Sequence, residues 1–321
     1  MLTIQFNTEI YQSINDNLLL NVPVPSILGV TSALQNIGKV RNRGLELNLI
    51  TRNFTGDFTW TTDFNISFNR NIVLELGPEG TPIITGQQTS SITSVGRPIG
   101  DFFGFVHDGI YNTQEEIDSR PSLPSDRPGD PIIKDVNEDG IISVDDRTSL
   151  GNYQPDFYYG LHNSFSYKGF DLSVLIQGVQ GAEVMSLIYR QVMAMTGRTN
   201  SYGLARERWR SPEEPGNGEV YAASIDVHGY RRHPSSFYVQ DASYIRVRNI
   251  TLGYNFDSST IERLGASQVR LYLSAQNPFT FTNYLGYNPE VSSNHSALTP
   301  GIDYHNYPLA KSLVFGIDLT F

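Results

Sequence analysis

The chain has 321 residues, a formal net charge of −10 and no cysteine. The negative charge argues against a nucleic-acid-binding surface, and the absence of thiols excludes disulfides and thiolate metal sites. The sequence contains no run of about 18 apolar residues, so no transmembrane helix is expected. It also begins without a charged and then apolar leader, so no signal peptide is expected in it.

Eight segments alternate between apolar and polar residues, which predicts strands with one apolar face. They are 2–11, 43–51, 57–69, 157–167, 169–177, 243–256, 268–276 and 312–321. In the third segment, Phe58, Trp60 and Phe64 share one face. The two halves of the sixth segment are out of phase, which predicts a bulge near Arg248.

The last segment shows the pattern most simply, because its apolar residues alternate without a break up to the final Phe321. About ten residues with this period is the length that a tilted strand needs to cross a bilayer. A terminal strand of a soluble sandwich would alternate in the same way. The repetition of the pattern along the chain therefore carries more weight than this segment alone.

The connections between the predicted strands alternate in length. Short turns follow at 52–56, at Lys168-Gly169 and at 257–267, whereas 12–42, 70–156, 178–242 and 277–311 are long. Outer-membrane barrels have short periplasmic turns and long extracellular loops. The alternation therefore predicts an all-β, antiparallel, transmembrane barrel portion with long extracellular loops.

One long loop contains a helical pattern. Ala182–Met195 carries an apolar stripe at helical spacing, formed by Val184, Leu187, Ile188, Val192 and Met195. A helix that packs on its own loop is the simpler interpretation of this stripe, and a helix that faces a partner is the alternative.

A second long loop carries a motif with explicit chemistry. Asp135, Asn137 and Asp139 occupy positions 1, 3 and 5 of a calcium loop, followed by a glycine at position 6. Ile141 would contribute its backbone carbonyl, and Asp146 stands at the acidic position 12. Calcium prefers six to eight oxygen ligands, so this spacing predicts a structural Ca²⁺ site. An acidic, solvated turn is the alternative.

The sequence resembles the SusC/RagA-like TonB-dependent outer-membrane transporters of Bacteroidota, and the match is to their C-terminal barrel half. The resemblance rests on Asn17–Pro25, Asn36–Leu47, Gly96–Gly104, Asp135–Asp146, Asp241–Tyr254, Ala275–Phe279 and the terminal Phe321. These stretches cover nearly the whole chain in order.

The resemblance implies about eight strands of a barrel of about 22 strands, embedded in the lipid of the outer membrane. It also implies import of oligosaccharides or peptides, with a SusD-like lipoprotein as a lid and TonB as the driver, and no enzymatic activity. The plug and the TonB box of the family are not found in this chain. A closing strand at 312–321 would therefore pair with a strand outside it.

Two other interpretations stay open from the sequence. One is a complete small barrel of eight strands with a structural or adhesive role, since eight is an allowed strand number. The other is a soluble extracellular carbohydrate-binding sandwich that calcium stabilises.

Overall fold

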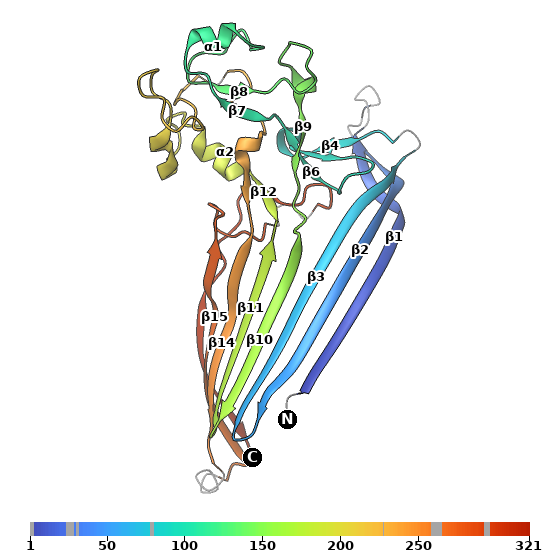
Figure 1. Ribbon diagram of the computed structural model, residues 1–321, viewed down its shortest axis with the longest axis vertical. Helices are drawn as coiled ribbons and strands as arrows, with labels where there is room; N and C mark the ends of the chain where they lie inside the picture. The colour runs from blue at the N-terminus through green and yellow to red at the C-terminus, as the bar shows by residue number, and fades with distance from the viewer. Residues whose placement is uncertain are drawn as a thin grey trace.

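The computed structural model describes residues 3–23, 29, 32–77, 80–226, 228–257, 265–291 and 296–321. Eight long strands form one antiparallel sheet, in the order β1-β2-β3-β10-β11-β14-β15-β17. They are β1 (Thr3–Pro23), β2 (Ser32–Thr55), β3 (Phe58–Leu76), β10 (Phe157–Tyr167), β11 (Phe170–Gln180), β14 (Tyr244–Asn255), β15 (Gln268–Thr282) and β17 (Ser312–Thr320). All eight predicted strands are confirmed. We call this sheet the wall (Figure 1).

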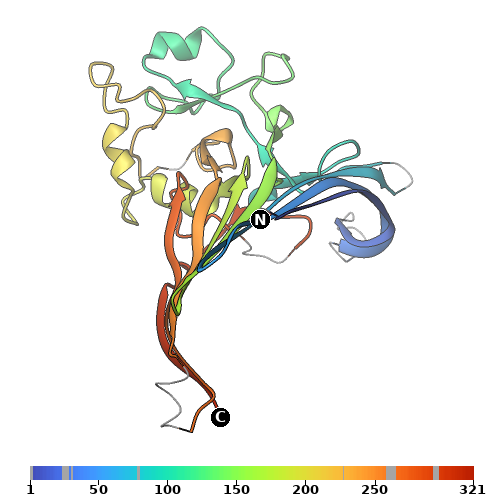
Figure 2. The ribbon, with the colours of Figure 1, turned by 60° about the horizontal axis from the view of Figure 1, so that its bottom comes forward.

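The wall is a single layer that bends along its width (Figure 2). In the described part of the chain, β1 pairs only with β2 and β17 pairs only with β15, so the sheet does not close on itself. The long strands are not divided between two packed sheets, which disagrees with the sandwich interpretation. The open edges likewise disagree with a complete small barrel.

The register places apolar residues of neighbouring strands side by side. Leu252 pairs with Leu172 and with Leu273, and Leu273 pairs with Phe315. Leu252, Leu273 and Phe315 are 48%, 45% and 67% exposed, although they form a continuous apolar row. One face of the wall is therefore apolar and uncovered. The bulge near Arg248 is confirmed, because the pairing of β14 skips this residue on both sides.

The predicted connection 12–42 is wrong in its extent. The pairing of β1 with β2 continues to Pro23 and Ser32. Register shifts between Asn15 and Leu18 break the alternation there, and Asn17 has a φ of 54°. Because the bulge changes which face each side chain occupies, a simple period of two does not detect this extension.

The segments between β3 and β10, between β11 and β14, and between β15 and β17 gather at one end of the wall (Figure 1). We call them the cap. Its strands are β4 (Ile83–Thr85), β5 (Ser91–Thr93), β6 (Asp101–Gly104), β7 (His107–Ile110), β8 (Pro131–Ile133), β9 (Thr148–Gly151), β12 (Glu183–Ser186), β13 (Val239–Asp241) and β16 (Ile302–Asp303). Its helices are α1 (Gln114–Asp118) and α2 (Leu187–Met193), with 3-10 turns η2 (Gln87–Thr89), η3 (Val144–Asp146), η4 (Gly203–Glu207) and η5 (Ser236–Tyr238). None of the described helices has the length and apolar character needed to cross a membrane.

The helix predicted over 182–195 is shorter than expected. Glu183–Ser186 forms strand β12, which pairs with β13 and β16, and only Leu187–Met193 is helical. Ser186 ends the strand and caps the helix, because its hydroxyl accepts a hydrogen bond from the Tyr189 N–H at 3.2 Å. The largest buried cluster lies here, around Met185, Tyr189, Met193, Tyr221 and Tyr238. The helix therefore packs within the cap, as the simpler interpretation predicted.

Candidate functional site

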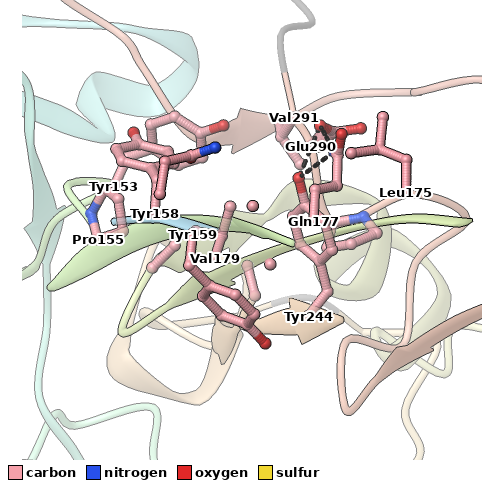
Figure 3. A pocket seen from close by; sticks show the side chains of 16 residues that line it. Tyr153, Pro155, Tyr158, Tyr159, Leu175, Gln177, Val179, Tyr244, Glu290 and Val291 are labelled. Atoms are coloured by element: carbon pink, nitrogen blue, oxygen red, sulfur yellow. Dashed lines mark hydrogen bonds between the residues drawn. The ribbon is translucent and has the colours of Figure 1, made fainter. Parts of the chain in front are cut away.

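A pocket of about 510 Å³ opens on the polar face of the wall, next to the cap. Its floor comes from β3, β10, β11 and β14, and its sides come from the segments around Tyr153 and Glu290 (Figure 3). Gly160 gives room to the Asn65 side chain in the floor, because a Cβ at this position would approach Asn65 Nδ2 to 2.9 Å. The volume lies in the range that is typical of small-ligand sites.

Glu290 is the charged group of this pocket. One of its carboxylate oxygens accepts hydrogen bonds from the Tyr244 hydroxyl at 2.7 Å and from Gln177 Nε2 at 3.4 Å. The other pairs with the guanidinium of Arg246, whose side chain is 1% exposed. Burial alone would raise the pKa of Glu290, but the hydrogen bonds from Tyr244 and Arg246 outweigh it and hold the pKa below its ordinary value. Glu290 is therefore ionised and neutralised by a fixed partner.

Arg246 is held in place by further hydrogen bonds. Its Nε donates to Thr280 Oγ1 and its Nη2 donates to Asn288 Oδ1, both at 3.0 Å. Because Arg246 balances the charge of Glu290, the carboxylate can accept hydrogen bonds from a neutral ligand without requiring a cation. Tyr153 lies on the other side of the pocket, where burial raises its pKa to about 12 and keeps its hydroxyl neutral. The pocket thus combines aromatic rings with fixed hydrogen-bonding groups.

The pocket residues were not among the predicted site residues. Tyr244 and Arg246 lie within the stretch Asp241–Tyr254, which carries part of the resemblance. Alternation could place them on the polar face only after the bulge was located. Glu290 lies in an irregular segment, so nothing in the local sequence indicates its pairing with Arg246.

The predicted calcium loop forms a turn of the expected kind. Gly140 has a φ of 82°, and its N–H donates to Asp135 Oδ2 at 2.8 Å. The Asp139 N–H donates to Asn137 Oδ1 at 3.1 Å, and the Ile141 N–H donates to Asp139 Oδ1 at 2.8 Å. These bonds turn the carboxylate and amide oxygens of the first three ligand positions toward the inside of the loop.

Asp146 has a structural role that the motif does not indicate. Its carboxylate is fully buried, and its oxygens accept the Val136 and Ser143 N–H groups at 2.8 Å each. With Ser143 it forms a capping box at the start of η3. The position-12 side chain therefore closes the loop through the backbone, which brings the two ends of the motif together.

The charged oxygens of the loop are only partly satisfied. Asp135 Oδ1 is buried and has no hydrogen-bond partner. Among the residues that the structure describes, no three His, Cys, Asp or Glu side chains are gathered closely enough to hold a metal ion, and this includes the aspartates of the loop. Calcium at Asp135, Asn137, Asp139, Ile141 and Asp146 stays a prediction.

The chain is similar in sequence to several receptors over nearly all of its length. It is 32% identical to TonB-dependent receptor P3 of Formosa agariphila, over 99% of this chain and 32% of that protein. It is 27% identical to TonB-dependent receptor SusC of Bacteroides thetaiotaomicron, over 95% of this chain and 29% of that protein. Over nearly its whole length the chain is thus similar to part of TonB-dependent receptors, SusC among them. It spans about a third of the length of the relatives it matches. No family profile matches it.

The fold agrees with this family. A chain of the RagAB peptide transporter superposes with a TM-score of 0.81 at 20% identity, over 99% of this chain and 33% of that one. The same importer in an open-open state gives a TM-score of 0.77. The eight strands of the wall are therefore arranged as in part of a RagA-like receptor. The similar proteins are named as receptors and transporters rather than as enzymes.

Proposed function

We propose that this chain is the C-terminal barrel portion of an outer-membrane, TonB-dependent nutrient importer. Such an importer takes up oligosaccharides or peptides, with a SusD-like lipoprotein as a lid and TonB as the source of energy. The similarity to SusC and to the RagAB transporter supports this proposal. In this proposal the apolar face of the wall contacts lipid, the polar face lines the lumen, and the cap lies outside the cell.

The observation that carries the proposal is the distribution of aromatic residues on the apolar face. At the turn end of the wall, the rings of Phe54, Phe58, Trp60 and Phe165 contact one another at centroid distances between 5.7 and 6.4 Å. Toward the cap, Phe157 contacts both Phe68 and Tyr159. Aromatic girdles at both edges of an apolar band are the signature of a membrane barrel.

The spacing of these two aromatic groups fits a bilayer. Trp60 and Phe68 lie eight residues apart on β3, or about 27 Å at about 3.4 Å per residue. Barrel strands are tilted, and the apolar band of an outer-membrane barrel is about 25 Å tall. Phe64 and Leu161 pair with each other between the two groups, and Leu252 and Leu273 on the same face of the wall are about half exposed. A soluble sheet would leave this surface in water without a partner.

The pocket beside Glu290 lies where a solute would pass between the cap and the lumen. Its fixed carboxylate, its amide and its tyrosines can hydrogen-bond to sugar hydroxyls or to peptide groups. Both solute classes are compatible with a neutralised Glu290. The pocket is therefore our candidate for a substrate contact in this portion of the receptor.

We also propose that the loop Asp135–Asp146 binds a structural Ca²⁺ ion. The glycine turn and the inward oxygens of Asp135, Asn137 and Asp139 support it, as does the orphaned oxygen of Asp135. Ile142 anchors the loop, because it is buried against Phe105 and Ile133. In this proposal the ion would stiffen the cap rather than act as a sensor.

The proposal is tested in the native host with a tag inserted after Pro215, in an exposed turn of the cap. We expect the tagged receptor in the outer-membrane fraction, co-purifying in detergent with a SusD-like lipoprotein. Deletion of the gene should abolish uptake of a labelled oligosaccharide or peptide. Recovery of a folded, monomeric protein from a detergent-free soluble fraction would show that the proposal is wrong.

A further inference from the structure

Three arginines lie in two segments of the cap, and two of them bind the same turn. Arg147 follows η3, Arg190 lies on α2, and Arg232 precedes η5. Arg147 donates from Nη1 to Thr89 Oγ1 at 2.5 Å, and Arg190 contacts the Gln88 side-chain oxygen. Arg190 Nη1 also donates to the Arg232 carbonyl at 2.8 Å. We call Arg147, Arg190 and Arg232 the arginine cluster.

The cluster differs from another buried arginine of the same cap. Arg231 is 7% exposed and pairs with Asp130 at 2.7 Å, where His228 Nε2 also lies 2.7 Å from this carboxylate. Arg190 is buried to a similar degree, at 5% exposed. Within the part of the chain that the structure describes, neither Arg190 nor the other two arginines of the cluster has a carboxylate within ion-pair distance.

The hydrogen bonds of the cluster are incomplete in the same way at all three residues. The Nε atoms of Arg147, Arg190 and Arg232 are buried and have no hydrogen-bond partner. Their observed acceptors are neutral carbonyl, amide and hydroxyl oxygens. Buried charges in proteins are normally paired and buried donors are normally satisfied. Arg190 departs from both rules, and the half-buried Arg147 and Arg232 depart from the second through their Nε atoms.

The surroundings of the cluster are held in a strained form. Gln88 and Thr89 have φ values of 54° and 56°, which residues with a Cβ rarely adopt. Arg147 and Arg190 both bind this turn. Burial lowers the pKa of Arg190 and of Arg147, and burial together with these two positive charges lowers the pKa of His233. Strained backbone of this kind is concentrated at active sites and ligand sites.

We propose that the arginine cluster binds an oxyanion of the sulfate, phosphate or carboxylate class. A guanidinium presents its Nε and Nη hydrogens as a planar fork that matches two oxygens of such an anion. One anion shared among the three side chains would balance their positive charge and give acceptors to their free Nε hydrogens. Because the arginines come from two segments of the cap and bind a turn of the first, the anion would tie these segments together.

The test uses the full-length protein, purified in detergent and chloride buffer, with inorganic sulfate and inorganic phosphate as probes. Thermal unfolding is followed at constant ionic strength. We expect a saturable rise in Tm of about 2 °C or more for the parent protein. Arg190→Met and Arg232→Met should lose this response. In chloride alone, Arg190→Met should unfold at the parent Tm or above it, because it removes an unpaired buried charge.

Arg231→Met is the matched control, since it removes a buried arginine that already has a carboxylate partner. It should lower Tm in chloride, because Asp130 is left without its cation, and it should keep the response to sulfate. Equal sulfate responses in the parent protein and in both cluster variants would overturn the proposal, because they indicate a general salt effect. A lower Tm for Arg190→Met in chloride, without a sulfate response of the parent protein, would assign the cluster to a protein carboxylate instead and would equally overturn it.

Discussion

The wall and the cap differ in how their apolar side chains are exposed to the surroundings. In the wall, apolar residues alternate regularly and stay exposed on one face, as Phe315 does at 67%. In the cap, the sequence shows no comparable period, yet Met185, Met193 and Tyr238 are almost completely buried. The wall needs an apolar surrounding from outside the chain, whereas the cap supplies its own. In the proposed barrel, lipid would stabilise the first region, whereas internal packing stabilises the second.

The largest effect is expected in the cap. Met185→Ala removes a fully buried side chain from the cluster that includes Tyr189 and Tyr221, and should destabilise the cap by about 2–5 kcal/mol. Hydrogen exchange of peptides from 181–243 measures it. Leu204→Ala is the control, because Leu204 is 36% exposed and its loss should change stability by less than about 0.5 kcal/mol. Equal protection in both variants would mean that the cluster does not hold the cap together.

The wall should respond to charge on one face only. Phe315→Arg places a cation on the apolar face and should disfavour the inserted barrel by about 2–4 kcal/mol. The neighbouring Val314→Arg points to the polar face and should be tolerated, although Val314 is also exposed, at 40%. The measurement is the folded fraction of receptor in purified outer membranes. If both substitutions behave alike, the apolar face does not contact lipid.

These two regions also differ in how much the sequence predicts. The strands of the wall follow from a period of two, because each residue's face is decided by its neighbours along the same strand. Even the bulge at Arg248 is visible as a change of phase. The cap depends on contacts between distant residues. Glu183–Ser186 carries a helical stripe but forms β12, because Val239–Asp241 and Ile302–Asp303 pair with it.

The calcium loop and the Glu290 pocket are also only partly predictable from the sequence. The motif predicts the turn at Asp135–Gly140, because its hydrogen bonds are local. It does not predict that Asp146 binds the Val136 and Ser143 N–H groups. The pairing of Arg246 with Glu290 joins residues of different segments, and no local pattern identifies it. Local chemistry is thus predictable from spacing, whereas convergence of side chains in the cap is not.

A smaller loss of stability is expected when a closely packed glycine on the polar face of the wall is substituted. A Cβ on Gly316 would lie 2.2 Å from the Tyr272 ring, which covers this glycine from the adjacent strand. Gly316→Ala should therefore destabilise the wall by about 1–3 kcal/mol through overpacking. Thermal unfolding in detergent measures it.

Two further variants test whether the Tyr272 ring causes this loss of stability. Tyr272→Ala combined with Gly316→Ala should cost less than the sum of the single substitutions, because the clash is removed. Gly203→Ala in the cap has nothing within 4 Å of the added Cβ and should be nearly neutral. If the effects of the Tyr272 and Gly316 substitutions are additive, the loss of stability in Gly316→Ala does not come from a clash with the tyrosine ring.

The smallest effect concerns the metal that would stiffen the cap. Asp139→Ala removes the position-5 ligand and should lower the stability of the segment between β3 and β10 by about 1 kcal/mol in millimolar calcium. In chelator the difference from the parent protein should shrink to the loss of the hydrogen bond from the Ile141 N–H, because a ligand stabilises a fold only while it is bound. Asp145→Ala is the matched control, since it removes an acid from the same loop at a position that contributes no ligand. Hydrogen exchange of 130–150 with and without calcium separates the two aspartates. If chelator leaves the exchange of the parent protein unchanged, the loop is held by its own hydrogen bonds, including those to Asp146, and the metal assignment is wrong.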